Sequence, residues 1–277
     1  MVRTSLLFAA ALVSAVAVHA QSVDDIIAKD IQARGGLEKL KAVQSMKMTG
    51  KMSVGPGMEA PIVLRAKRPD ALRMDFTFQG MTASQAFDGK SGWQIMPFNG
   101  KKDAEALPPD ELKDIEEQAD FDGPLVDYKA KGNKVELIGK EKIEGTDAYN
   151  IKVTLKNGDI RNIYIDADSY LPVREASKRQ VRGADQEVET SMGDYKDVQG
   201  LMFPMSMESS IKGNPQTQKI TVDAVELNPP VEDAIFKMPA PSAAPAATEK
   251  AEPTPNKTAP ATGTDKKPDV PKDTPKK

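Results

Sequence analysis

Residues 60–78 read APIVLRAKRPDALRMDFTF and form the most informative stretch of the chain. On both sides of Lys67-Arg68-Pro69, apolar side chains occupy every second position. These apolar positions are Ala60, Ile62, Leu64, Ala66, Leu72, Met74, Phe76 and Phe78. A period of two is typical of β-strands that bury one face. The stretch therefore predicts two antiparallel strands, each with one apolar face.

The same alternation continues in both directions from this stretch. Further strands are predicted at residues 46–54, 82–87, 91–96, 135–138, 149–155, 159–165, 171–181, 187–195, 201–211 and 218–227. Asp88-Gly89 marks a turn, and Asn157-Gly158 is a strong signal for a two-residue hairpin. Because strands recur about every ten residues, the chain is predicted to form an antiparallel meander.

Helical periodicity appears in two segments. Near the N-terminus, Val23, Ile26, Ile27 and Ile31 fall on one helix face, and Gly35-Gly36 predicts the helix end. Residues 102–128 interrupt the strands, and a helix is predicted to begin at Pro108-Pro109-Asp110. Its acidic residues are interpreted as a solvated helix face; they are Asp110, Glu111, Asp114, Glu116, Glu117, Asp120 and Asp122.

A sheet of about a dozen strands with one apolar face must cover that face. The short helical segments are too small to cover such a sheet if it is flat. We therefore predict a mainly β protein of the α+β class, an unclosed antiparallel β-barrel of about 11–12 strands. Its short helices would form a plug or lid. A barrel of this kind can hold one apolar ligand.

The two ends of the chain differ from the rest. Residues 1–20 combine Arg3, an apolar run and Val18-His19-Ala20, which is the pattern of a cleaved secretory signal peptide. Residues 239–277 contain nine prolines and no Leu, Ile, Phe, Tyr or Trp, so a disordered tail is predicted. One domain is expected at residues 21–238. No cysteine follows the apolar run, which excludes a lipid anchor there.

Composition excludes several classes of function. The chain has 38 Lys+Arg against 41 Asp+Glu, and this slight acidity argues against nucleic-acid binding. It has no cysteine, and its only histidine, His19, lies in the predicted signal peptide. Thiolate and imidazole metal sites and the common catalytic pairs are therefore excluded from the mature protein. We expect no catalytic residue, metal or cofactor; a hydrolase using carboxylates is a minor alternative.

Three motifs resemble a known family. They are Lys67-Arg68-Pro69, Asp88-Gly89-Lys90 ahead of Trp93, and the ending Ile235-Phe236-Lys237-Met238-Pro239. Together with the signal peptide and strand number, they resemble the LolA/LolB-like superfamily of periplasmic lipoprotein carriers and outer-membrane lipoprotein-sorting proteins. The resemblance implies an unclosed β-barrel with a helical lid over a hydrophobic cavity. It also implies that Arg68 helps to hold the lid closed.

Methionine and aromatic side chains are the candidate cavity lining. The expected residues are Met48, Met52, Leu64, Met74, Phe76, Phe78, Phe87, Trp93, Ile151, Val153, Met205 and Met207. Methionine is flexible and polarizable, so it suits acyl chains of variable shape. Ordinary core packing is the alternative interpretation for each of these residues.

The favoured hypothesis is a periplasmic, non-covalent carrier of lipids or lipoprotein acyl chains that acts in outer-membrane lipoprotein sorting. Membrane proteins that load and unload it are the expected partners, with no nucleic acid and a monomeric state. The alternative is a lipid-sensing or protein-interaction module on the same fold.

Overall fold

The computed structural model describes residues 21–181 and 184–240. The predicted signal peptide and nearly all of the predicted tail lie outside the described residues. The first elements are α1 (Val23–Ala33), α2 (Leu37–Ala42), β1 (Ser45–Gly55), β2 (Met58–Lys67), β3 (Ala71–Phe78), β4 (Met81–Asp88), β5 (Gly92–Met96), η1 (Pro97–Asn99), β6 (Lys101–Ala106), α3 (Pro109–Gln118) and α4 (Tyr128–Lys131). The remaining elements are β7 (Lys134–Ile143), β8 (Thr146–Thr154), β9 (Ile160–Asp166), β10 (Pro172–Val181), β11 (Ala184–Gly193), β12 (Lys196–Val198), β13 (Leu201–Phe203), β14 (Ser206–Ile211), β15 (Thr217–Leu227) and η2 (Asp233–Phe236). No helix in the described part of the chain is long and apolar enough to cross a membrane.

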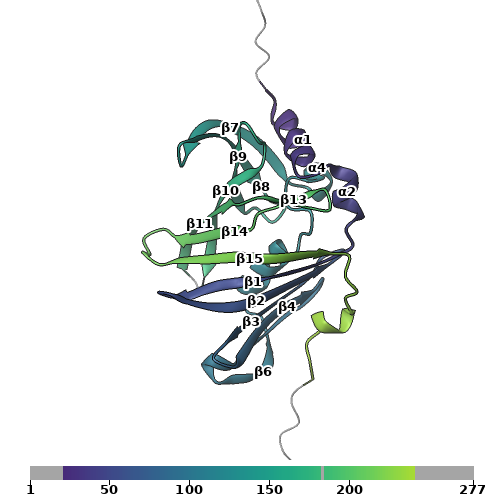
Figure 1. Cartoon of the computed structure of the whole chain (residues 1–277), viewed down its shortest axis with the longest axis vertical. Coiled ribbons are helices and arrows are strands. Elements are labelled where there is room, and N and C mark those ends of the chain that lie inside the picture. Colours follow the sequence, from purple (N-terminus) through teal and green to yellow (C-terminus); the bar gives the residue numbers. More distant parts are fainter. Residues whose placement is uncertain (1–20, 182–183, 241–277) are drawn as a thin grey trace, which may run out of the picture. The chain divides into compact units, whose positions relative to one another are not determined.

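One antiparallel sheet of thirteen strands dominates the fold (Figure 1). Its strand order is β6-β5-β4-β3-β2-β1-β15-β14-β11-β10-β9-β8-β7, and β12 and β13 form a separate hairpin. The predicted meander is correct within β1–β6 and within β7–β11. It is wrong at β15, which lies between β1 and β14 and so joins the two halves. The sheet does not close, because β6 and β7 are its two edges.

The sheet curls around α3. This helix contacts both β4 and β10, which are separated by six strands in the sheet order. In a flat sheet these two strands would lie about 34 Å apart, at about 4.8 Å per strand spacing. A helix of ten residues is only about 15 Å long. The sheet must therefore bend around the helix, and the predicted unclosed barrel with helices is confirmed.

The N-terminal helix forms where the sequence predicts it. Ser22 caps α1 in a capping box with Asp25, in which each backbone N–H donates to the other residue's side chain. Gly35 follows the helix at φ +118°, and a Cβ there would lie 2.2 Å from the carbonyl oxygen of Gly200. Only glycine satisfies both the positive φ and this close approach.

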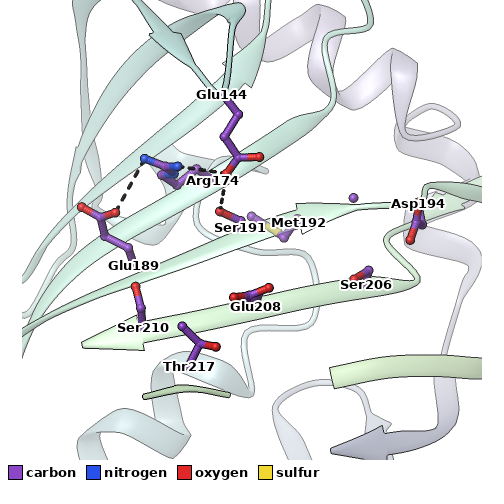
Figure 2. Close-up of a pocket in the computed structure, with 11 residues that line it drawn as sticks. Glu144, Arg174, Glu189, Ser191, Met192, Asp194, Ser206, Glu208, Ser210 and Thr217 are labelled. Carbon is purple, nitrogen blue, oxygen red and sulfur yellow. Dashed lines mark hydrogen bonds and ion pairs between the residues drawn. The ribbon is translucent and has the colours of Figure 1, made fainter. Parts of the chain in front are cut away.

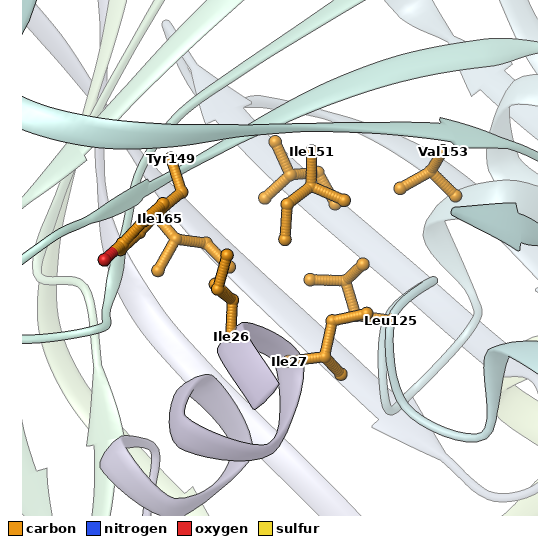
Figure 3. Close-up of a cluster of buried hydrophobic side chains, with 8 residues drawn as sticks. Ile26, Ile27, Leu125, Tyr149, Ile151, Val153 and Ile165 are labelled. Atoms are coloured by element: carbon orange, nitrogen blue, oxygen red, sulfur yellow. The ribbon is translucent and has the colours of Figure 1, made fainter. Parts of the chain in front are cut away.

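Two apolar clusters lie on the same side of the sheet. In the first, Ile26 and Ile27 of α1 pack against Ile151 and Val153 of β8 and their neighbours (Figure 3). In the second, Ile115 of α3 belongs to a cluster with residues of β2, β3 and β4. Cross-strand partners point to the same sheet face, and the strand register connects the two clusters through every intervening strand. We call this face, which α1 and α3 cover, the inner face.

Two strand predictions were wrong. Residues 101–106 form the edge strand β6, although this part of the chain was expected to interrupt the strands. Its sequence, KKDAEA, lacks the apolar alternation that identifies the other strands. The predicted strand at 201–211 is divided into β13 and β14, which belong to different sheets. The break falls at Pro204 and Met205, and proline cannot donate a backbone hydrogen bond to a ladder.

Candidate lipid-binding face and its helical cover

An apolar surface lies on the inner face of β1, β2 and β3. Met48, Leu64 and Met74 are direct cross-strand neighbours and are all half-buried. Phe76 and Phe78 continue this surface along β3, with ring centroids 5.5 and 6.4 Å from the exposed Phe98 of η1. The structure thus brings five of the predicted lining residues together on one face.

The same surface continues across β15 to β14. Met52 pairs with Ile220, and Ile220 pairs with Met207; all three are half-buried. Phe87 of β4 also lies on the inner face, but it is fully packed in the cluster around α3. Seven half-buried predicted residues therefore share one apolar surface, which we call the apolar band. Phe87 lies beside this band, packed beneath α3.

Three predicted lining residues are ordinary buried residues in this structure. Ile151 and Val153 lie on the inner face, but α1 covers them and leaves them with no exposed surface. Met205 is buried between β13 and β14. These three positions have no partly exposed surface of the kind seen at Met48 or Met74.

Trp93 is a correction to the predicted lining, because it lies on the outer face. It pairs with Ala86 of β4, which in turn pairs with Arg73 of β3, and these positions alternate with the inner-face residues. Its Nε1 donates to the carbonyl oxygen of Phe236 at 2.7 Å, and Phe236 is itself buried. The C-terminal segment that contains η2 therefore covers Trp93 from outside the curled sheet.

Arg68 joins three parts of the fold just after β2. Its guanidinium donates to the carbonyl oxygens of Leu40 and Val43, at the end of α2, at 3.0 and 2.7 Å. It also donates two hydrogen bonds to Asp122, at 2.5 and 2.9 Å, in the segment that follows α3. The ring of Phe121 lies 4.6 Å from the guanidinium carbon. Arg68 thus connects the sheet to α2 and to the α3 segment.

Asp122 is the acidic partner in this contact. Lys41 of α2 also donates to its carboxylate at 2.6 Å. Burial alone raises the pKa of Asp122, but the hydrogen bonds from Arg68 and Lys41 outweigh burial and lower that pKa to about 2. The carboxylate is therefore ionised at any physiological pH and is held between two cations.

The interpretation of the acidic residues as one solvated helix face was therefore wrong for three of them. Asp122 is only 7% exposed, Glu117 pairs with Arg161 of β9, and Asp120 pairs with Lys131 of α4. Helical periodicity could not identify Asp122, since it lies beyond the end of α3. Its apolar neighbours Phe121 and Leu125 were the available signal that this part of the segment is buried.

Two recesses lie outside the apolar band. One of about 480 Å³ lies beside Arg68 and is lined by Gln44, Arg68, Pro69, Asp70, Asp120, Phe121, Asp122 and Lys131. The other, of about 340 Å³, is strongly polar, and Arg174 lies in it between Glu144 and Glu189 (Figure 2). Within residues 21–181 and 184–240, no group of three or more His, Cys, Asp or Glu is placed to hold a metal ion.

Comparison with solved structures shows the same architecture in other proteins. A LolA superfamily protein from Nitrosomonas europaea aligns over 79% of this chain and 98% of its own, with a TM-score of 0.54 and 13% identity. The chain has the LolA-like fold. A putative outer membrane lipoprotein-sorting protein domain from Vibrio parahaemolyticus aligns over 76% and 94%, with a TM-score of 0.53 and 13% identity.

A third structure extends the LolA-like fold to a differently named group. A DUF1329 family protein from Desulfovibrio piger aligns over 79% of this chain and 98% of its own, with a TM-score of 0.52 and 12% identity. No protein-family model matches the sequence, and no curated protein matches it significantly. At these identities the likeness establishes the fold, and the function has to be argued from the site.

Proposed function

We propose that this protein carries lipids non-covalently, with their acyl chains bound on the inner face of the curled sheet. The observation that supports this most directly is the band of half-buried apolar side chains between the two packed clusters. Its predicted members are Met48, Met52, Leu64, Met74, Phe76, Phe78 and Met207. Ile151, Val153, Met205 and Phe87 support this surface from the packed core, and Trp93 is not part of it.

The energetics of this function need no catalytic group. Burial of one CH₂ stabilises a complex by about 0.8 kcal/mol, so a chain of 12–16 carbons gains on the order of 10 kcal/mol. Four of the seven residues in the band are methionines, which adapt to different chain shapes. Apolar burial alone thus accounts for binding, and we propose that the protein is not an enzyme.

In this proposal α3 and the segment after it are the movable cover. Arg68 is the gating residue, because its contacts with Asp122 hold that segment against α2 and the end of β2. Loss of these contacts would free the cover and allow the acyl chain to enter or leave. The recess beside Arg68 makes this contact accessible from solvent, where a membrane partner could reach it.

We further propose that the protein acts in the periplasm as a monomer and delivers lipoprotein acyl chains in outer-membrane lipoprotein sorting. The sequence of residues 1–20 supports export. The solved structure from Vibrio parahaemolyticus, described as an outer membrane lipoprotein-sorting protein domain, supports the sorting role by its fold.

Native mass spectrometry of detergent-free protein, purified from its own compartment, tests the carrier function. A lipid or lipoprotein bound in roughly stoichiometric amount would support the proposal and identify the cargo. An empty protein that also fails to take up a fluorescent fatty acid would overturn it. The lipid-sensing or protein-interaction function would then be favoured, and it predicts partner capture that depends on residues 239–277.

A further inference from the structure

A single buried cation lies on the inner face. Among the residues that the structure describes, Arg161 is the only lysine or arginine that is buried, with 7% of its surface exposed. It pairs with Val153 of β8 and Ser177 of β10, so it belongs to the inner face at the edge of the α1 cluster. On one side its inner-face neighbours are the buried apolar residues of β8 and β9, and on the other side they are Glu175 and Ser177 of β10.

Two carboxylates hold the guanidinium of Arg161. Its Nη2 contacts Glu117 of α3 at 2.5 Å, and its Nη1 contacts Glu175 of β10 at 2.9 Å. The buried Nε has no hydrogen-bond partner among the described residues. Burial alone lowers the pKa of Arg161, but Glu175 and Glu117 outweigh burial and raise it, so the group stays cationic.

The two carboxylates differ in what happens when the cover moves. Glu175 belongs to the sheet and stays beside Arg161, whereas Glu117 belongs to α3 and leaves with the helix. Arg161 would then have an unpaired Nη2 in addition to its unpaired Nε. Buried donors without partners are unfavourable. A second anion that takes the place of Glu117 would satisfy them and restore negative charge beside the guanidinium.

We propose that Arg161 binds the anionic head group, a carboxylate or a phosphate, of the carried lipid at the place that Glu117 occupies in the closed form. This inference rests on the proposed carrier function and adds to it a class of ligand. Arginine suits the role because its planar fork binds carboxylate and phosphate through two parallel hydrogen bonds.

The surroundings of Arg161 fit a lipid of this kind. The row of cross-strand partners that begins at Arg161 continues through Ser177 to Val188 of β11 and Ile211 of β14. Val188 and Ile211 are half-buried, and Met207 lies on the same face of β14. An acyl chain anchored at Arg161 can therefore extend along the inner face toward the apolar band.

Calorimetric titration with dodecanoate, dodecyl phosphate and dodecan-1-ol tests the head-group site, because the three probes share one acyl chain. Wild-type protein is expected to bind at least one of the two anions about tenfold more tightly than the alcohol. The better anion distinguishes a carboxylate from a phosphate ligand. Arg161→Met is expected to abolish this preference while it retains binding of the alcohol.

Arg174→Met is the matched control. Arg174 also lies between two carboxylates, Glu144 and Glu189 (Figure 2). The strand register places it on the other face of the sheet, on the neighbouring strand β10. This variant should keep the preference for the anion. Glu117→Gln should strengthen anion binding more than alcohol binding, since it removes the competing carboxylate as well as loosening the cover.

The outcomes separate this inference from the carrier function. If wild type binds all three probes equally, or if Arg161→Met keeps the tenfold preference, the head-group site is wrong and the carrier function stands. If wild type binds none of them, the carrier function fails. If Arg161→Met does not fold, Arg161→Lys replaces it, and an undiminished preference in Arg161→Lys would overturn the bidentate site.

Discussion

At the residue scale, two arginines hold the α3 segment from opposite halves of the sheet. Arg68 follows β2 and contacts Asp122, whereas Arg161 lies in β9 and contacts Glu117. Charge-assisted hydrogen bonds of this kind are stronger than neutral ones and depend on geometry. The position of α3 therefore depends on a small number of polar contacts as well as on the apolar surface beneath the helix.

Replacement of Arg68 should weaken retention of a bound lipid. Arg68→Leu removes both hydrogen bonds to Asp122 and those to α2, so a fluorescent fatty acid is expected to dissociate several-fold faster while the far-ultraviolet circular dichroism stays unchanged. Arg65→Leu is the matched control, since Arg65 pairs with Asp75 away from α2 and α3. Unchanged dissociation in Arg68→Leu would exclude Arg68 as the gating residue.

Acid should weaken the same contact. The pKa of Asp122 is about 2, below the ordinary value of 3.8, so its contact contributes stability above about pH 4 and loses it as the pH falls toward 2. Urea unfolding should show Asp122→Asn to be less stable than wild type by about 2 kcal/mol at pH 7. The difference should shrink steadily below pH 4; a constant difference down to pH 2 would contradict this account.

At the scale of elements, α3 is an amphipathic helix whose two sides contact different halves of the sheet. Ile115 and Leu112 pack in the apolar cluster of β2–β4, while Glu117 and Lys113 pair with Arg161 and Asp159. The helix is therefore held to one half of the sheet by apolar contacts and to the other half by ion pairs. The β12–β13 hairpin, by contrast, is bound to the end of α1, where Met202 donates its backbone N–H to Arg34.

Loss of apolar contact under α3 should loosen this helix selectively. Ile115→Ala removes a buried side chain and should cost about 2–4 kcal/mol. Hydrogen exchange of residues 109–118 should accelerate, and a fluorescent fatty acid should enter faster. Ile26→Ala serves as the control, because Ile26 is equally buried but belongs to α1. Faster exchange at 109–118 in the control would show that the two helices do not move independently.

At the scale of the described molecule, the two faces of the sheet are covered by different segments of the chain. The inner face carries α1, α3 and the apolar band. Part of the outer face is covered by the C-terminal segment, in which Ile235 and Phe236 accept hydrogen bonds from Arg73 and Trp93. The outer contact buries Phe236 and Trp93, while the inner face carries the half-buried residues proposed to bind the acyl chain.

A substitution on the outer face should affect stability and leave binding unchanged. Phe236→Ala is expected to lower the free energy of unfolding by about 3–5 kcal/mol and to shift the fluorescence emission of Trp93 to the red, since Phe236 is almost fully buried. Dodecanoate affinity of the folded variant should equal that of wild type. A large loss of affinity would show that the two faces are coupled.

Much of this architecture can be predicted from the amino-acid order alone. A period of two in apolar residues identifies most strands, since one face of each is buried, and capping at Ser22 with glycine at Gly35 delimits α1. Seven residues of the apolar band follow from the same alternation. The edge strand β6 does not, because its sequence KKDAEA contains no large apolar residue and most of it is exposed.

Other features depend on which segments meet in space. The alternation of apolar residues places Trp93 on one face of β5 but does not show which face is the inner one. In the structure Trp93 lies on the outer face, where the segment that contains η2 covers it. Likewise, nothing local in the sequence shows that Glu117 pairs with Arg161, 44 residues away, or Asp122 with Arg68, 54 residues away. Strand pattern is a local consequence of burial, whereas pairing, burial of charge and the position of the cover arise only when the curled sheet brings distant residues together.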